Sequence, residues 1–210
     1  MSNQIATTDS ATALLAEICG GAQPSVQMMI GIGLVKDSEA VFFQYLGDDR
    51  APQALMMPSG KPVTRISSVT LTGIDVAEGI GEFNSTKLNV FFTTGEGRTM
   101  MLTSGLTTLW SQCVLTGLVE VFNSGDLSQP VSLDSWKGTS KMKPCFAAVR
   151  QGGEKMSNTD LYNDLANARA TKSTGKQMDL LKDAVDVIKG YFGEVPADVV
   201  VTVEEDGTDY

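Results

Sequence analysis

The sequence of 210 residues contains no histidine. Histidine is the usual acid–base group of enzymes near neutral pH, and it completes Ser-His-Asp and Cys-His catalytic groups and many zinc sites. No cluster of acidic residues within the body of the chain replaces it as a set of metal ligands. We therefore expect a protein without catalytic residues, metal or cofactor, and we predict that it is not an enzyme.

Cysteines and long apolar runs are also scarce. Cys19, Cys113 and Cys145 are separated and form no Cys-x-x-Cys pair, which is typical of a reducing compartment, so we expect a cytoplasmic protein. No apolar run approaches the roughly eighteen residues of a transmembrane helix, and we expect no membrane partner. The N-terminal residues include Asp9 and Glu17 and lack the basic segment of a secretory signal.

Positive charge is unevenly distributed in a chain whose net charge is −9. Residues 1–136 carry six basic and thirteen acidic residues, a net charge of −7. Residues 137–189 carry ten basic and six acidic residues, a net charge of +4, and residues 190–210 carry six acidic residues and no basic ones. This asymmetry predicts an anionic partner for the middle segment, although a run of solvated lysines produces the same pattern.

Hydrophobic periodicity predicts a fold of the α+β class. Alternating apolar residues and turn signals predict a hairpin from residues 26–36 and 40–46, a long strand over 66–79, a second hairpin from 87–94 and 98–102, and a strand over 143–150. Residues 48–65, which contain three prolines, are expected to form a loop. We predict a curved antiparallel sheet or a small OB-like barrel with one inserted amphipathic helix and a C-terminal helical pair.

The strongest helical pattern lies in residues 106–122, where apolar side chains recur on one face and include Trp110 and Gly117. This spacing favours a core role for Trp110. Further helices are predicted over 10–19, 157–169 and 173–192. We expect a β-rich core domain over residues 1–155, a helical appendage over 156–192 and an acidic C-terminal tail over 193–210.

Cations and aromatic residues gather between residues 136 and 155, and this segment is the strongest candidate for a binding site. Cations neutralise phosphates, and an aromatic ring stacks on an unpaired base with a gain of about 1–3 kcal/mol. In a strand over 143–150, Phe146 and Arg150 share one face, but the sequence leaves open whether Phe146 and Phe91 face solvent or the core. The candidate nucleic-acid-binding residues are Trp136, Lys137, Lys141, Lys143, Phe146, Arg150 and Lys155, with Phe91, Lys87 and Arg98 from the second hairpin.

The chain ends in VEEDGTDY, which is acidic and closes on an aromatic residue. With the predicted sheet, this ending resembles the acidic-tailed OB-fold single-stranded DNA-binding proteins of bacteria and phages. In that class the tail docks partner proteins of replication and repair and competes with DNA. The resemblance implies a partner-binding role for Glu204, Glu205, Asp206, Asp209 and Tyr210.

The leading interpretation is a nonspecific single-stranded nucleic-acid-binding protein, for DNA rather than RNA, that acts in replication, recombination or repair. We also expect a homo-oligomer, because small β domains expose sheet edges. Two alternatives remain open. One is a structural or assembly protein, viral for example, that acts through protein contacts; the other is a small-molecule-binding protein in which Gly31 and Gly33 permit close approach.

Overall fold

The structure is a computed structural model that describes residues 28–35, 38–46, 51–80 and 84–192. The helix predicted over 10–19 and the acidic tail, with Glu204, Glu205, Asp206, Asp209 and Tyr210, lie outside the described residues. The described chain mixes strands with helices, which confirms the α+β class. The strands are β1 (Met28–Ile32), β2 (Phe42–Leu46), β3 (Ala51–Ala54), β4 (Arg65–Ile80), β5 (Ser85–Thr94), β6 (Thr99–Gly105), β7 (Val131–Lys137), β8 (Cys145–Gln151) and β9 (Glu154–Met156), and the helices are α2 (Leu109–Ser124), α3 (Thr159–Ala170) and α4 (Thr174–Phe192).

The described strands form one open sheet in the order β3-β2-β1-β6-β5-β4-β7-β8-β9. Every neighbouring pair is antiparallel except β1 and β6, which run parallel. The parallel pairing of β1 with β6 departs from the purely antiparallel sheet that was predicted. A small barrel would be closed by pairing of its first and last strands, whereas among the described strands β3 and β9 are the edges of an open sheet. Alternation within a strand shows which side chains share a face, but not which strand lies beside it.

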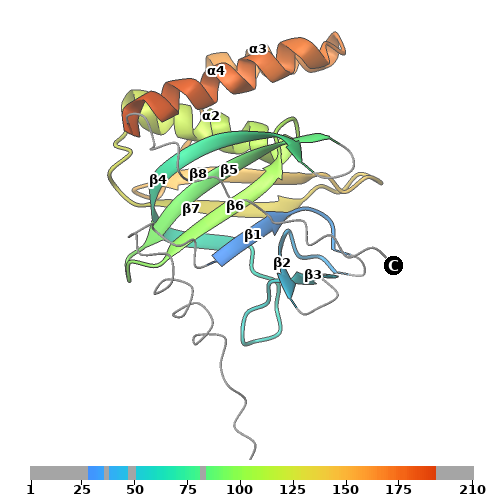
Figure 1. The fold of residues 1–210 in the computed structure, drawn as a ribbon, viewed down its shortest axis with the longest axis vertical. Coiled ribbons are helices and arrows are strands. Elements are labelled where there is room, and N and C mark those ends of the chain that lie inside the picture. Colours follow the sequence, from blue (N-terminus) through green and yellow to red (C-terminus); the bar gives the residue numbers. More distant parts are fainter. Residues whose placement is uncertain (1–27, 36–37, 47–50, 81–83, 193–210) are drawn as a thin grey trace, which may run out of the picture.

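β4 joins the two halves of the sheet. Its residues 69–80 pair with β5, whereas residues 65–69 pair with β7. The register shifts between Ile66 and Val69 and again between Leu71 and Gly73, and Ser68 has a positive φ of 54°. Irregularities of this kind bend a strand and increase its twist. As a result, the two halves of the sheet curve around a common core beneath α2 (Figure 1).

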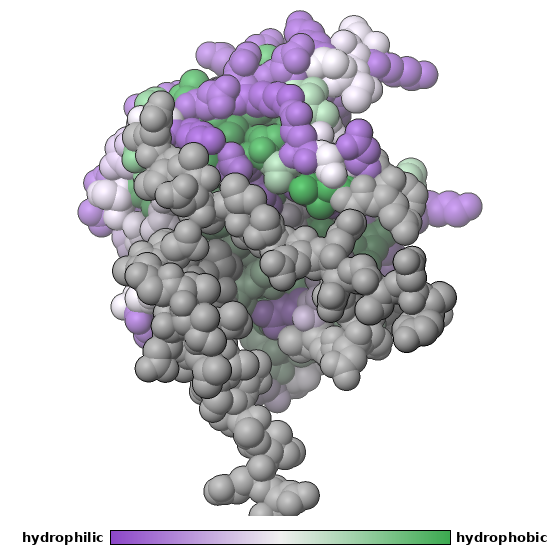
Figure 2. Space-filling model, in the orientation of Figure 1, coloured by the Kyte–Doolittle hydropathy of each residue, from purple (hydrophilic) through white to green (hydrophobic). Residues whose placement is uncertain are grey.

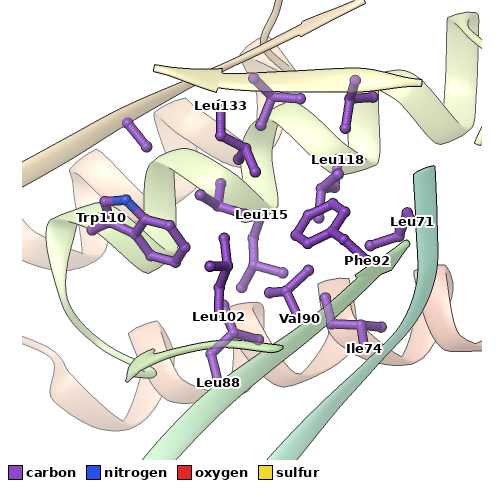
Figure 3. Packing of buried hydrophobic residues seen from close by; sticks show 14 of the residues in the cluster. Leu71, Ile74, Leu88, Val90, Phe92, Leu102, Trp110, Leu115, Leu118 and Leu133 are labelled. Carbon is purple, nitrogen blue, oxygen red and sulfur yellow. The ribbon is translucent and has the colours of Figure 1, made fainter. Parts of the chain in front are cut away.

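α2 packs inside this curve. The hydroxyl of Thr108 caps the helix by accepting a hydrogen bond from the Ser111 backbone N–H, so the helix begins at Leu109, three residues later than predicted. Trp110 is fully buried, and its indole N–H donates to the hydroxyl of Ser135 at 3.0 Å. The predicted core role of Trp110 is therefore confirmed. Figure 3 shows the apolar core to which it belongs, which includes Leu88, Val90, Phe92, Leu102, Leu115, Leu118 and Leu133.

α3 and α4 form a second layer above α2 (Figure 1), and both helices lie within two residues of their predicted ends. Leu165 of α3 and Leu181 of α4 are fully buried in the same core as α2. Lys189 forms an ion pair with Asp75 at 3.0 Å, which ties α4 to β4. The outward surface of this layer is mainly hydrophilic (Figure 2). The division of the chain into a core domain, an appendage and a tail stays a prediction.

Three strands were not predicted. The expectation of a loop over 48–65 is wrong for β3, whose Pro52 pairs with Tyr45 of β2. Proline cannot donate to a neighbouring strand, and it is tolerated in β3 because this strand is an edge of the described sheet. β7 carries a period-two pattern in which Val131, Leu133 and Ser135 are buried, and β9 has three residues, too few for a periodic signal.

Candidate nucleic-acid interface

Trp136 and Phe146 stand directly opposite each other on β7 and β8. Their rings stack with centroids 6.1 Å apart and planes inclined by 19°. Trp136 is 45% exposed and Phe146 is partly exposed, whereas Ala147 and Val149, on the other face of β8, are buried. The ring pair therefore lies on the sheet face that points away from α2, which answers the question that the sequence left open for Phe146.

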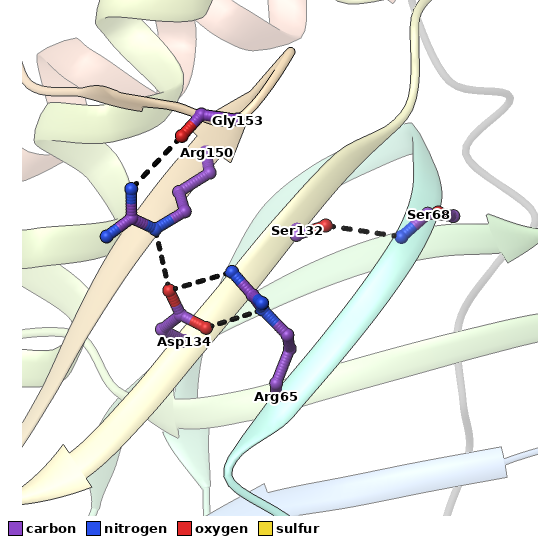
Figure 4. A network of polar contacts seen from close by, with 6 residues as sticks. All are labelled: Arg65, Ser68, Ser132, Asp134, Arg150 and Gly153. Atoms are coloured by element: carbon purple, nitrogen blue, oxygen red, sulfur yellow. Dashed lines mark hydrogen bonds and ion pairs between the residues drawn. The ribbon is translucent and has the colours of Figure 1, made fainter.

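Asp134 lies on the same face of β7 as Trp136 and forms ion pairs with two arginines. Its carboxylate accepts from Nε of Arg150 at 2.7 Å and from Nε of Arg65, on β4, at 2.7 Å (Figure 4). Arg150 also donates to the carbonyl oxygen of Gly153 at 3.1 Å. These contacts hold both guanidinium groups against Asp134, two residues from Trp136 on the same strand, in a row that crosses three strands.

Lys155 on β9 pairs in register with Arg150 and adds an exposed cation to the same face. With it, the face carries three basic side chains and one carboxylate, which leaves it positively charged in a protein whose net charge is −9. We call this set of residues the β7–β8 outer surface; it consists of Arg65, Asp134, Trp136, Phe146, Arg150 and Lys155.

The other predicted lysines of this segment lie beside the β7–β8 outer surface rather than on it. Lys137 follows Trp136 along β7 and points to the opposite face, where its ammonium donates to the carbonyl oxygen of Ser38. Lys143 forms an ion pair with Glu39 at 2.7 Å, and this contact holds the pKa of Glu39 below its ordinary value. Lys141 is exposed and forms no ion pair with the described residues.

The candidate residues of the second hairpin are not brought to the ring pair. Phe91 lies on the outward face of β5, where its ring covers Gly73 of β4. Lys87 pairs with Ala77, near the end of β4 that is remote from Arg65.

Arg98 lies in the turn after β5, where it forms an ion pair with Glu96 at 3.5 Å. This turn adjoins Thr94, which pairs with Val69 of β4. Val69 in turn pairs with Val131, at the end of β7 opposite to Trp136. Arg98 is therefore separated from the ring pair by the length of β7.

Sequence analysis missed two members of the surface, Arg65 and Asp134. Asp134 carried a usable signal, because Val131 and Leu133 alternate with polar residues and place Asp134 on the same face as Trp136. Arg65 carried none, since its position depends on the pairing of β4 with β7 across more than sixty residues of chain.

Comparison of the chain with protein-family models, with curated proteins and with solved structures gives no match. Within the described ranges, none of the helices combines the length and the apolar character needed to cross a bilayer.

Proposed function

We propose that the protein binds single-stranded nucleic acid through the β7–β8 outer surface, with DNA favoured over RNA by the resemblance noted in the sequence. The observation that carries this proposal is the stacked, exposed pair of Trp136 and Phe146 on a face with an excess of cations. Aromatic rings flanked by basic side chains form the usual surface for unpaired bases and their phosphates.

The ring pair supplies the contact to bases. One face of Trp136 is supported by Phe146, so the indole is held in place before a ligand arrives and loses little side-chain entropy on binding. Stacking of a base on such a ring contributes about 1–3 kcal/mol and does not depend on the base sequence. Nonspecific binding follows from this kind of contact.

The cations supply the contact to phosphates. Asp134 accepts from only some of the N–H groups of Arg65 and Arg150, which leaves further donors on both guanidinium groups for phosphate oxygens. Lys155 forms no ion pair with the described residues. Each phosphate contact with a single strand steepens the dependence of log affinity on log salt by about 0.7, so we expect binding to weaken strongly as salt rises.

The remaining parts of the proposal rest on the sequence. Residues 204–210 would recruit protein partners, and the protein would act without catalysis in replication, recombination or repair, in the cytoplasm and as a homo-oligomer. The acidic ending supports this role through the resemblance noted in the sequence, whereas the β7–β8 outer surface supports it by geometry.

The test is the fluorescence anisotropy of a labelled oligo-dT titrated with the protein. Replacing Trp136 by alanine should weaken binding by about tenfold or more, because the stacking contact is lost. Tyr162→Ala is the matched control, since Tyr162 is also an exposed aromatic, at 52%, but lies on α3 in the helical layer. Equal affinities of the two variants, or no binding by the intact protein at low salt, would contradict the proposal.

Assembly through protein contacts is the second candidate, and one observation favours it. Met29 on β1 and Tyr45 on the neighbouring β2 are exposed by 45% and 50%. Large apolar side chains on adjacent strands suit a protein interface. Sedimentation of the intact chain and of Met29→Glu tests it: an oligomer that dissociates in the variant supports assembly through this surface, and an unchanged oligomer or a monomeric intact chain contradicts it.

A further inference from the structure

A pocket of about 640 Å³ opens at the end of the sheet, on the inner side of β8. Its walls come from the end of β1, the start of α2 and the segment that joins β7 to β8. Ile32, Leu109 and Pro144 contribute apolar side chains, and Trp110 forms part of the wall. The volume falls within the roughly 300–1,000 Å³ of small-molecule sites, which are also mostly apolar.

Two hydroxyl groups of the wall, those of Ser104 and Thr108, are engaged in hydrogen bonds with each other and with Ser111. The Ser104 and Thr108 hydroxyls form a hydrogen bond at 3.0 Å, and Thr108 also donates to the Ser111 hydroxyl at 3.1 Å while capping α2. The Ser111 hydroxyl donates onward to the carbonyl oxygen of Gly105 at 2.8 Å. Because these groups satisfy each other, the pocket presents mainly carbon to a ligand, and a polar ligand body would lose its hydrogen bonds to water without replacement.

Among the described residues of the lining, Lys141 is the one with a charged side chain. It is exposed and forms no ion pair with the described residues. The first turn of α2 contains no acidic residue that would offset the positive end of the helix. A ligand with a negative head group therefore complements the mouth of the pocket.

We propose that this pocket binds a small hydrophobic carboxylate, with its alkyl chain inside the pocket and its carboxylate against the ammonium of Lys141. The site is distinct from the β7–β8 outer surface, because Cys145 and Trp110 line it from the inner side, whereas Trp136 and Phe146 lie on the outward face. Lys141, which the sequence placed among the nucleic-acid-binding residues, belongs to this pocket.

The first experiment follows the fluorescence of Trp110 in the full chain carrying Trp136→Phe, where Trp110 is the one remaining tryptophan of the two. Dodecanoate, added below its micelle concentration, should change the emission saturably. Shortening the chain should weaken binding by about fourfold per methylene removed from the pocket. An emission that does not change, or an affinity independent of chain length, would overturn the proposal.

The second experiment tests the head group. Lys141→Glu should weaken dodecanoate binding by about tenfold or more and leave the binding of dodecan-1-ol unchanged. Lys176→Glu is the matched control, because Lys176 is an exposed lysine on α4 that is not part of the pocket. If wild-type protein binds the alcohol as tightly as the carboxylate, or if both lysine variants bind dodecanoate equally, the assignment of a carboxylate ligand is wrong.

The third experiment locates the ligand. Cys145 lines the pocket, and burial raises the pKa of its thiol, so labelling with N-ethylmaleimide is measured at alkaline pH and resolved for each cysteine by peptide mass. Dodecanoate should slow the labelling of Cys145 severalfold and leave that of Cys113, which lies on α2 outside the pocket lining, unchanged. Binding without protection of Cys145 would place the ligand elsewhere and overturn the proposal.

None of these three measurements involves nucleic acid, so failure of the pocket proposal is distinguishable from failure of the proposed function.

Discussion

Gly117 of α2 lies against Val149 of β8 so closely that a Cβ atom built on the glycine would be 2.5 Å from Cγ2 of the valine. The same atom would be 3.2 Å from the carbonyl oxygen of Met156. The missing side chain lets α2 approach the sheet at this point, and this contact covers the inner face of β8. The opposite face of β8, which carries Phe146, is left for other contacts.

Gly117→Ala should destabilise the protein by about 1–3 kcal/mol, since overpacking against Val149 outweighs the gain of about 1 kcal/mol in helix propensity. Gly190→Ala on α4 is the matched control: no atom of the described residues lies within 4 Å of the added atom, so we expect propensity alone to act and stability to rise by up to about 1 kcal/mol. Urea unfolding measures both. Equal stabilities for the two variants would show that α2 lies farther from β8 than described.

Ser135→Ala should cost about 1–3 kcal/mol of stability, because it leaves the buried indole N–H of Trp110 without its acceptor. Ser132→Ala is the control on the same strand. The Ser132 hydroxyl accepts a long, exposed hydrogen bond of 3.4 Å from the Ser68 N–H, and its loss should change stability by less than about 0.5 kcal/mol. Thermal and urea unfolding compare the two. A Ser135 variant as stable as the Ser132 variant contradicts the buried hydrogen bond.

Asp134→Asn should strengthen nucleic-acid binding by about two- to fivefold at low salt, because it removes the one carboxylate of the β7–β8 outer surface and releases Arg65 and Arg150. The cost in stability should be small, about 0–1 kcal/mol, since both ion pairs are partly exposed. Asp160→Asn, an exposed acid on α3, is the control for the change in net charge. Anisotropy with oligo-dT measures affinity. Equal effects of the two variants would mean that affinity depends on the net charge of the protein alone.

The pKa of Glu39 is lowered from 4.5 chiefly by its hydrogen bond with Lys143 and by the charge of that lysine. The ion pair therefore stabilises the fold above this ordinary value, and its contribution is lost as pH falls through the lowered pKa. Lys143→Ala should return the pKa of Glu39 towards 4.5.

Asp126 is the internal control in the same titration, which carboxyl NMR can follow. Its pKa is lowered by hydrogen bonds from the hydroxyl and backbone N–H of Ser128, and Lys143 takes no part in them. The Lys143 variant should leave this pKa unchanged. An unaltered Glu39 titration in the variant would show that the ion pair with Lys143 does not persist in solution.

Much of the local structure could be predicted from the sequence, because local structure depends on spacing. Apolar residues at a helical period identified the buried face of α2, with Trp110 and Gly117 on it. Alternation in β8 correctly separated Phe146 and Arg150 from Val149. By contrast, nothing in the spacing indicated β3, where Pro52 suggested a loop, or the parallel pairing of β1 with β6.

The candidate site was likewise predictable only in part. The concentration of cations and aromatic residues after residue 135 is a property of the sequence, and so are the absence of histidine and the acidic ending. Tertiary structure decided which of these side chains lie close together. Register between β7 and β8 brought Trp136 onto Phe146, and pairing of β4 with β7 added Arg65.

The sequence by itself thus determined composition, charge and the faces of single elements, because these depend on residues close together in the chain. Only the tertiary structure decided that Lys137 and Lys143 contact residues 38 and 39, and that Lys141 borders a pocket instead of the ring pair. Contacts between residues about one hundred positions apart depend on how strands pair, and strand pairing is selected by burial of the whole core rather than by local pattern.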